Sequence, residues 1–146
     1  MNIVVDSSVI VAALISTSDE GAWSERVIED ASLFAPELLR VEVTNIIRRL
    51  ERAKEISGQD ANAAYADFME LDLVLHSFEP LSDRIWELRH NVTSYDAWYV
   101  AVAESLGLPL ATLDSRLAVA KGPSCRFLTP WPSQVQDATA GSKRLR

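Results

Sequence analysis

The stretch from residue 94 to residue 114 constrains the fold more than any other part of the sequence, because it predicts a helix followed at once by a buried strand. Good helix formers fill residues 95–106. Gly107 is a typical helix terminator, and Pro109 prevents the helix from resuming. The apolar residues 110–113 then predict a short buried strand. A helix that leads directly into a strand is typical of folds in which the two alternate.

The rest of the chain repeats this alternation. Apolar runs predict further strands at residues 2–5, 33–35, 73–75 and 126–128. Helices are predicted at residues 9–15, 21–31, 36–54, 60–71, 81–89 and 115–121, with Pro36 in the first turn of its helix. The helix at 60–71 is expected to turn Ala63, Ala64, Phe68 and Leu71 inward. The alternation predicts an α/β fold of three layers, α/β/α, with a mostly parallel central sheet flanked by helices. We expect one domain over residues 1–130 and a flexible tail over residues 131–146, which are rich in Pro, Ser, Gln, Thr, Gly and basic residues.

Charge and cysteine content limit the function classes. The 21 acidic residues exceed the 14 basic ones and give a net charge of −7, which works against indiscriminate nucleic-acid binding. The lone Cys125 excludes an intrachain disulfide and fits a reducing compartment. The sequence has no apolar run of ~18 residues that could cross a membrane, and its start lacks the basic residues of a signal peptide. We therefore expect a cytoplasmic protein with no membrane partner.

Four acidic residues from separate segments are predicted to meet at one edge of the sheet. Asp6 and Asp114 each follow a predicted strand, Asp96 lies in the first turn of the helix at 95–106, and Glu42 lies on the apolar side of the helix at 36–54. In open α/β sheets, ligands bind outside the carboxyl ends of the strands. These acids are therefore the candidate functional residues.

Each acid also has a structural alternative. Asp6 and Asp114 could cap the helices that follow them, Thr93 and Asp96 match a capping box, and Glu42 could reach solvent. Their convergence argues for a site, because adjacent carboxylates repel one another and some would protonate unless cations were bound. Ligands that offer only oxygen favour Mg²⁺ or Mn²⁺, and a site of this kind suits the hydrolysis of phosphodiester bonds.

Other catalytic arrangements find little support. His76 and His90 lie in no motif, and Ser7, Ser8 and Ser115 lack the surroundings of a triad serine. We expect these serines to cap helices or to support neighbouring side chains through hydrogen bonds. The sequence contains no glycine-rich phosphate loop and no zinc-binding spacing.

Four motifs occur together in an order and spacing that resembles a known family. They are V-V-D-S-S-V-I-V-A-A-L around Asp6, E-V-T-N from Glu42, S-Y-D-A-W-Y-V-A-V-A-E around Asp96, and L-A-T-L-D-S-R-L-A around Asp114. The chain resembles the PIN domains and, among them, most resembles the VapC-type ribonuclease toxins of bacterial toxin–antitoxin pairs. The resemblance extends from Ile3 to about Leu128, and its most specific part is the pair of motifs around Asp96 and Asp114.

The resemblance implies that an acidic quartet holds Mg²⁺ or Mn²⁺: Asp6, Glu42, Asp96 and Asp114. It also implies that Thr112 and Ser115 support these acids. The implied activity is metal-dependent endonucleolytic cleavage of RNA by the toxin of a type II toxin–antitoxin system. The implied partners are RNA, a second copy of the chain in a homodimer, and a VapB-type antitoxin that pushes a basic side chain toward the acids.

Basic and aromatic residues add further candidates. Arginines that could contact phosphates are Arg48, Arg49, Arg52, Arg84, Arg89 and Arg116, although a solvated surface charge is the alternative for each. Aromatic residues that could line a dimer or antitoxin surface are Trp23, Trp86, Trp98 and Tyr99. Core packing explains these aromatics equally well.

Two rival functions remain open at this point. A phosphatase related to the haloacid dehalogenases also begins with a strand ending in Asp, but it needs a second Asp where this chain has Ser8. A non-catalytic PIN-like module that binds RNA or protein would keep the acids for structural reasons only. Stabilisation of the protein by Mn²⁺ would separate a metal-dependent enzyme from such a module.

Overall fold

A computed structural model describes residues 1–132 of the chain. The predicted flexible tail falls almost entirely on residues 133–146, which lie outside the described residues. The domain boundary at residue 130 therefore stays a prediction. No helix within residues 1–132 is both long and apolar enough to span a membrane.

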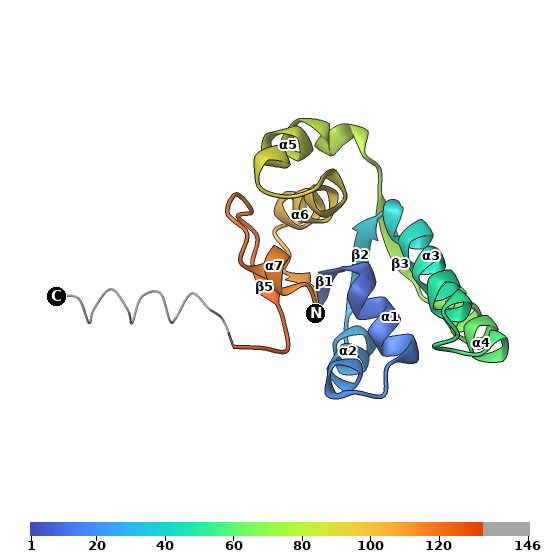
Figure 1. The fold of residues 1–146 in the computed structure, drawn as a ribbon. Coiled ribbons are helices and arrows are strands. Elements are labelled where there is room, and N and C mark those ends of the chain that lie inside the picture. The colour runs from blue at the N-terminus through green and yellow to red at the C-terminus, as the bar shows by residue number, and fades with distance from the viewer. Residues whose placement is uncertain (133–146) are drawn as a thin grey trace.

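Five parallel strands form the central sheet (Figure 1). They lie in the order β3-β2-β1-β4-β5, and every neighbouring pair is parallel. Their bounds are β1 Asn2–Val5, β2 Ser32–Pro36, β3 Leu73–His76, β4 Leu110–Ala111 and β5 Phe127–Leu128. The central β1 is apolar because it is covered on both faces, and Ile3, Val4 and Val5 are fully buried.

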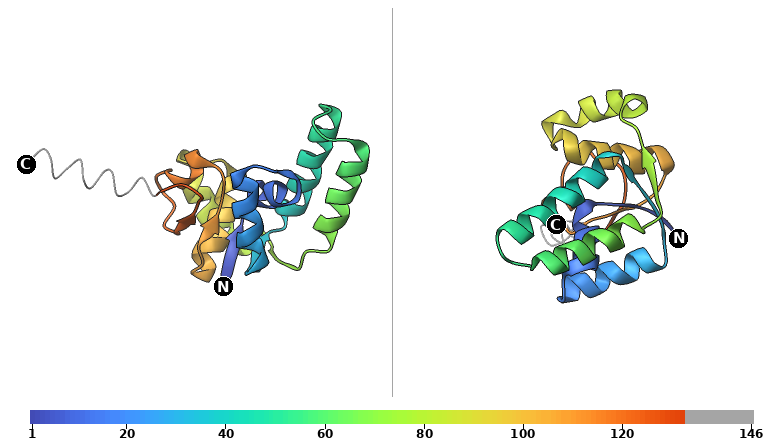
Figure 2. Two further views of the ribbon diagram at one scale, coloured as in Figure 1. Left: turned by 90° about the horizontal axis from the view of Figure 1, so that it is seen from below. Right: turned by 90° about the vertical axis from the view of Figure 1, so that its right-hand side faces the viewer.

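Helices cover both faces of the sheet (Figures 1 and 2). In Figure 1, α5 and α6 lie above the sheet and α1 and α2 lie below it, while α3 and α4 form a hairpin that packs beside α1. Their bounds are α1 Ser7–Ile15, α2 Asp19–Glu29, α3 Leu38–Arg52, α4 Gly58–Met69, α5 Ser82–Glu87, α6 Ser94–Leu106 and α7 Ser115–Ala118. The predicted three-layer α/β/α fold is confirmed.

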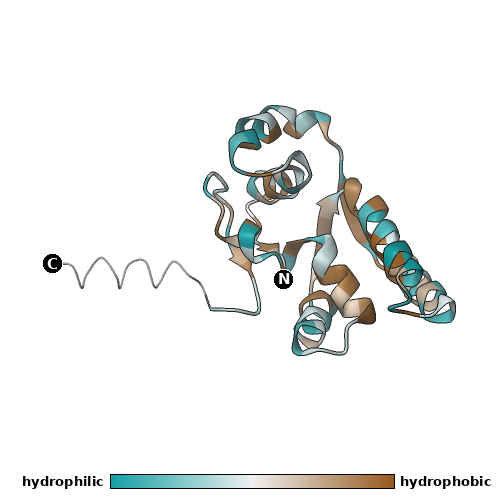
Figure 3. Cartoon of the chain, viewed as in Figure 1, coloured by the Kyte–Doolittle hydropathy of each residue, from teal (hydrophilic) through white to brown (hydrophobic). Residues whose placement is uncertain are grey.

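Helix α6 is the most deeply buried helix, and its sequence explains both its ends. The Thr93 side chain accepts a hydrogen bond from the first turn, and Gly107 adopts a left-handed conformation with φ of 65° that ends the helix. Its residues 99–103 are all buried, because the sheet covers one side of α6 and α5 packs against it as well. By contrast, α3 and α4 carry one apolar and one hydrophilic face (Figure 3), and Leu39, Val43 and Ile47 of α3 lie in the core as their spacing predicts.

Three sequence-based predictions about these elements were wrong. Pro36 is the last residue of β2 rather than the first turn of a helix. This position tolerates proline because β1 pairs with β2 only as far as Phe34, so no ladder bond is lost. Ala63 is exposed rather than buried, because α4 turns Ala61, Ala64 and Phe68 inward.

The third error concerns the helix predicted at residues 81–89, which is interrupted. Only Ser82–Glu87 is α-helical, and short 3₁₀ turns at Glu79–Leu81 and Leu88–His90 flank it. Turns of this kind are frequent at helix ends.

The strand order places a topological switch point, at which the chain changes the direction in which it adds strands, between β1 and β4. From β1 the chain builds outward through β2 to β3, and it later returns to the other side of β1 to form β4 and β5. Ligands of open α/β sheets bind at the carboxyl ends of the strands beside such a point. Val5 pairs with Ala111 there, so the next residues, Asp6 and Thr112, leave the sheet side by side.

Candidate active site

Asp6 lies at the centre of the candidate site, directly after β1. It is only 7% exposed, and its backbone N–H donates a hydrogen bond to the Ala111 carbonyl oxygen, with an N···O distance of 3.0 Å. Its Oδ2 accepts two hydrogen bonds, from Ser8 Oγ at 2.7 Å and from Thr112 Oγ1 at 2.9 Å. These bonds compensate part of the cost of burying the carboxylate.

The same two hydroxyls also fix the loop that follows β4. Ser8 Oγ accepts a hydrogen bond of 3.1 Å from the Leu113 N–H, and Thr112 Oγ1 accepts one of 3.0 Å from the Asp114 N–H. The predicted strand at 110–113 is therefore shorter than expected, because the Leu113 N–H bonds to a side chain instead of a neighbouring strand. The two hydroxyls thereby couple the position of Asp114 to that of Asp6.

Asp114 serves as the N-cap of α7, and Asp6 does not cap α1. Asp114 Oδ1 accepts hydrogen bonds from the Arg116 and Leu117 N–H groups at 3.0 and 3.2 Å. The Asp6 side chain makes no such bond to α1, although Asp6 occupies the N-cap position. The capping alternative therefore accounts for one oxygen of Asp114 and fails for Asp6.

Glu42 and Asp96 reach the site from α3 and α6. Glu42 is half-buried, and its Oε1 accepts a hydrogen bond of 2.6 Å from the hydroxyl of Tyr99, a residue that is 1% exposed. Asp96 lies one turn before Tyr99 on the same face of α6. Its backbone N–H donates to Thr93 Oγ1 at 3.2 Å, which is one half of the expected capping box.

The electrostatics show that the four acids share one region. Burial raises the pKa of Asp6 against the lowering effect of the Ser8 and Thr112 hydroxyls, and the charge of Asp114 raises it further. Burial also raises the pKa of Glu42, with the charges of Asp6 and Asp96 adding to it. Each acid therefore lies close enough to at least one other for their charges to interact.

Burial and the charge of Asp6 raise the pKa values of both Asp96 and Tyr99. Burial raises the pKa of Asp96, and the charges of Asp6 and Asp114 raise it further. Burial, followed by the charges of Glu42 and Asp6, raises the pKa of Tyr99 far above its ordinary value. Tyr99 thus stays protonated and donates its hydrogen to Glu42.

The donor chemistry of this cluster fits a hard divalent cation. Within residues 1–132, one oxygen each of Asp6, Glu42 and Asp114 accepts a hydrogen bond and the other accepts none. In that part of the chain, no three Asp, Glu, His or Cys side chains converge on a single point as a ready-made metal cluster. Mg²⁺ does not require one, because it commonly binds one or two carboxylates and keeps several waters.

Not every predicted site residue lies among the acids. Ser115, expected to support them, is an exposed first residue of α7 and makes no hydrogen bond to them among the described residues. Ser8 and Thr112 do contact Asp6. The sequence-based reasoning treated Tyr99 only as a core or surface aromatic, although its position three residues after Asp96 could have indicated a place in the site.

Two of the arginines considered for phosphate contact are already engaged. Arg84 Nε donates to Glu104 Oε2 at 2.7 Å, and Arg84 also pairs with Glu87 at 3.2 Å. The guanidinium of Arg89 stacks over the Trp86 ring with its carbon 4.3 Å from the centroid. These contacts favour structural roles for both arginines.

Comparison with known proteins gives concordant results. The family described as the PIN domain matches residues 3–123. The chain is 40% identical over 128 residues to Ribonuclease VapC1 of Mycobacterium tuberculosis, a match that covers 85% of this chain and 94% of the relative.

Solved structures with the same fold include two VapC proteins. The VapC20 toxin of M. tuberculosis, described as cleaving the sarcin–ricin loop, aligns with a TM-score of 0.59 and 19% identity over 79% of this chain and 92% of that one. VapBC2 from Rickettsia felis, solved with a DNA fragment from its promoter, aligns with a TM-score of 0.62 and 13% identity over 88% of this chain and 98% of that one. At these identities the structures show a shared fold alone.

Proposed function

This chain belongs to the PIN-domain family as a ribonuclease of the VapC type, and from that premise we propose that Asp6, Glu42, Asp96 and Asp114 are its catalytic, metal-binding residues. The observation that supports the proposal is geometric. Asp6 and Thr112 leave the sheet side by side at the switch point, and the Thr112 hydroxyl links the Asp6 carboxylate to the Asp114 backbone. Tyr99 of α6, one turn after Asp96, holds the Glu42 carboxylate. The reaction is hydrolysis of RNA phosphodiester bonds by an endoribonuclease that acts as the toxin of a toxin–antitoxin system.

The quartet would hold Mg²⁺ or Mn²⁺ through the carboxylate oxygens that accept no hydrogen bond. A bound ion of this kind lowers the pKa of a water molecule and stabilises negative charge that develops on the phosphate. Asp6 is held rigidly by Ser8 and Thr112, and Glu42 is held by Tyr99. Because these partners fix one oxygen of each carboxylate, the other oxygen keeps a defined direction toward the site.

The other two acids, Asp114 and Asp96, differ in how firmly their carboxylates are held. Asp114 is fixed by the first turn of α7 through Oδ1, and Asp96 is the member of the quartet whose carboxylate accepts no hydrogen bond in residues 1–132. Asp96 therefore has the greatest freedom to adjust to substrate. The four negative charges repel the phosphate backbone of RNA, so cations at the site should strengthen the binding of substrate.

A VapB-type antitoxin and a second copy of the chain are the proposed protein partners. Support for the antitoxin comes from the VapC-type relatives and from the VapBC2 complex with the same fold. A basic antitoxin side chain placed among the acids would offset the repulsion between their negative charges, and it would occupy the oxygens that a metal ion needs.

The deciding experiment maps new RNA ends produced by the purified protein. Antitoxin-free protein is incubated with total bacterial RNA in Mn²⁺ or in chelator, beside the Asp96→Asn variant. The matched control is Asp67→Asn, which removes an exposed acid from the distant helix α4. We expect discrete cuts that require both Mn²⁺ and Asp96 and that persist in the control.

Two other outcomes would carry different meanings. Cuts that persist in Asp96→Asn would contradict the assigned site while keeping the ribonuclease. Protein that cuts no RNA and binds no Mn²⁺ would favour the alternative of a non-catalytic PIN-like binding module.

A further inference from the structure

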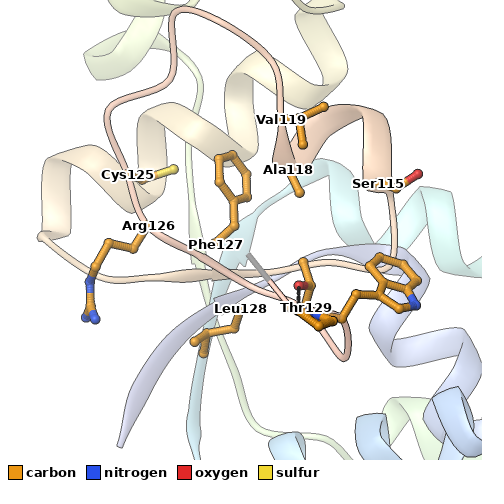
Figure 4. Close-up of a pocket in the computed structure, with 10 residues that line it drawn as sticks. Ser115, Ala118, Val119, Cys125, Arg126, Phe127, Leu128 and Thr129 are labelled. Atoms are coloured by element: carbon orange, nitrogen blue, oxygen red, sulfur yellow. Dashed lines mark hydrogen bonds between the residues drawn. The ribbon is translucent and has the colours of Figure 1, made fainter. Parts of the chain in front are cut away.

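A cavity of about 610 Å³ lies between α7, β5 and the segment that follows β5 (Figure 4). We call it the β5 pocket and define it by six of its lining residues: Ser115, Val119, Cys125, Phe127, Thr129 and Trp131. In Figure 4, Phe127 lies between Cys125 on one side and Ala118 of α7 on the other. The volume falls within the roughly 300–1,000 Å³ that is typical of sites for small organic groups.

Two covalent or hydrogen-bonded links join the β5 pocket to the acid site. Ser115, at one end of the pocket, directly follows Asp114. Leu128 also lines the pocket, and its carbonyl oxygen accepts a hydrogen bond of 3.0 Å from the N–H of Thr112. Thr112 is the residue whose hydroxyl holds Asp6. One wall of the pocket therefore begins directly after Asp114, and the other is hydrogen-bonded to the residue that holds Asp6.

The wall formed by β5 is anchored before any ligand arrives. Glu104 Oε1 of α6 accepts a hydrogen bond of 2.8 Å from the Ser124 N–H, one residue before the pocket wall begins. Arg84 holds Glu104 through two hydrogen bonds and donates a third, of 2.9 Å, to the Gly122 carbonyl oxygen. A preformed wall of this kind lowers the ordering cost of binding.

The lining combines aromatic faces with hydroxyl groups. Phe127 and Trp131 offer ring surfaces, and the Ser115 hydroxyl can donate and accept hydrogen bonds. The Thr129 hydroxyl already donates to the Trp131 carbonyl oxygen at 3.0 Å, so it offers a ligand an acceptor. Burial raises the pKa of the Cys125 thiol to about 11, so this thiol stays protonated and unreactive at neutral pH. The pocket is thus equipped for binding rather than for covalent chemistry.

Positive charge flanks the β5 pocket in a chain that is acidic overall. Arg126 lines the pocket and the exposed Arg116 follows Ser115. Among the residues that the structure describes, neither arginine forms an ion pair. Neither side chain would have to break a salt bridge to contact a phosphate group. In Figure 4 the Arg126 side chain extends away from Phe127 and Ala118, so it would contact a phosphate outside the pocket.

We propose that the β5 pocket is a subsite that receives one base of the RNA strand next to the cleaved phosphodiester. The inference rests on the proposed ribonuclease function. It adds that this pocket helps to determine which RNA sequence is cleaved. Single-stranded RNA is recognised by stacking of its bases on aromatic side chains and by hydrogen bonds to the base edges, and the lining supplies both. The flanking arginines and the contact with the acid site favour a nucleotide over an apolar protein side chain.

The test compares Trp131→Ala with Trp86→Ala, which removes an exposed tryptophan from α5, away from the pocket. A labelled single-stranded decaribonucleotide of mixed sequence is titrated in chelator, and binding is followed by fluorescence anisotropy. Loss of one base–aromatic stack should weaken binding about ten-fold. With Mn²⁺ present, Trp131→Ala should also change which bases border the mapped cuts, while Trp86→Ala should leave binding and cuts unchanged.

A second variant, Ala118→Phe, fills the pocket without removing a wall and should produce the same loss. Thermal unfolding of each variant shows that it is folded.

If the wild type cuts RNA but both pocket variants bind and cut as it does, the pocket proposal is overturned and the ribonuclease stands. If the variants lose only their inhibition by the antitoxin, the occupant is a protein segment and the proposal is again overturned. If the wild type cuts no RNA yet binds the decamer through Trp131, the ribonuclease function fails and the base-binding pocket remains.

Discussion

The hydroxyl of Tyr99 donates a hydrogen bond of 2.6 Å to Glu42 Oε1, although the two residues lie 57 positions apart in the chain. Tyr99 belongs to α6, which covers one face of the sheet, and Glu42 belongs to α3 in the hairpin beside α1. This single contact sets the direction of the Glu42 carboxylate relative to Asp96, one turn before Tyr99. Tyr99 is thus a positioning residue that acts through Glu42.

Tyr99→Phe should reduce RNA cleavage while leaving the fold intact, because the ring keeps its place in the core and only the hydroxyl is lost. Hydrogen bonds to charged groups contribute about 1.5–3 kcal/mol, so we expect a fall of at least about ten-fold in kcat/KM. The Mn²⁺ concentration that gives half-maximal activity should rise as well. Tyr95→Phe, which alters an exposed tyrosine of the same helix, is the control. Equal behaviour of the two variants would show that the hydroxyl has no positioning role.

Asp96→Asn should stabilise the metal-free protein at neutral pH. Burial and the charges of Asp6 and Asp114 raise the pKa of Asp96 above the value of 3.8 that it has in an unfolded chain. The folded state therefore holds the proton more tightly, and the free energy of unfolding falls as the pH rises from 3.8 through the raised pKa. Since Asp96 is partly exposed, solvent screening reduces the effect, and we expect the thermal midpoint in chelator at pH 7 to rise by roughly 2 °C.

The pH dependence provides the check on that prediction. Below pH 3.8 the carboxyl group of Asp96 is protonated in both states, so the difference between Asp96→Asn and the wild type should disappear. Asp67→Asn, which alters an exposed acid of α4, is the control at pH 7. An Asp96→Asn protein that is less stable than the wild type at pH 7 would mean that the carboxylate makes favourable contacts in the folded protein.

Mn²⁺ should raise the thermal midpoint of the wild-type protein, because an ion that binds only the folded state stabilises it by mass action. At a concentration 100 times the dissociation constant, the gain is about 2.7 kcal/mol. Asp6→Asn should lose most of this gain, and Asp67→Asn should keep it. A shift of the same size in the Asp6→Asn variant would place the ion elsewhere on the protein.

Glu104→Gln should destabilise the fold, and Glu87→Gln should not, although both glutamates pair with Arg84. Burial acts to raise the pKa of Glu104, but hydrogen bonds from Arg84 and Ser124 outweigh it and hold the pKa below its ordinary value. The stabilisation is therefore present at neutral pH and is lost as the pH falls through that lowered pKa. We expect about 1–3 kcal/mol for Glu104→Gln in urea unfolding at pH 7 and within about 0.5 kcal/mol of zero for the more exposed Glu87.

Local signals in the sequence predicted the order of the elements and the gathering of the acids. The β-branched run before Asp6 and the apolar run before Asp114 identify buried strands, and the carboxyl ends of parallel strands share an edge. Gly107 and Thr93 gave the ends of α6 to within one residue, since caps depend on local chemistry. The expectation that Asp6 and Asp114 follow the carboxyl ends of two strands came from these signals, whereas the strand order and its switch point did not.

Contacts between distant residues were beyond prediction. The bond from Tyr99 to Glu42 depends on how α3 and α6 are placed across the sheet, which no local pattern encodes. The β5 pocket is likewise formed by two segments, and its existence depends on the loop held by Glu104 and Arg84. Pro36 was misassigned because its tolerance in β2 depends on where β1 stops pairing.

The hydrogen bond from Thr112 to Asp6 joins residues that are 106 positions apart, so it can form only late in the synthesis of the chain. A ribosome adds residues at about 5–20 per second, so roughly 5–20 s pass between the synthesis of Asp6 and that of Thr112. Throughout this interval the nascent chain lacks Thr112 and Asp114, so Asp6 has only one of its two hydroxyl partners, Ser8, and at least one of the other three acids is missing. The proposed acidic site can therefore be completed only after the segment that carries Asp96, Thr112 and Asp114 has been synthesised, which falls in the last third of the chain.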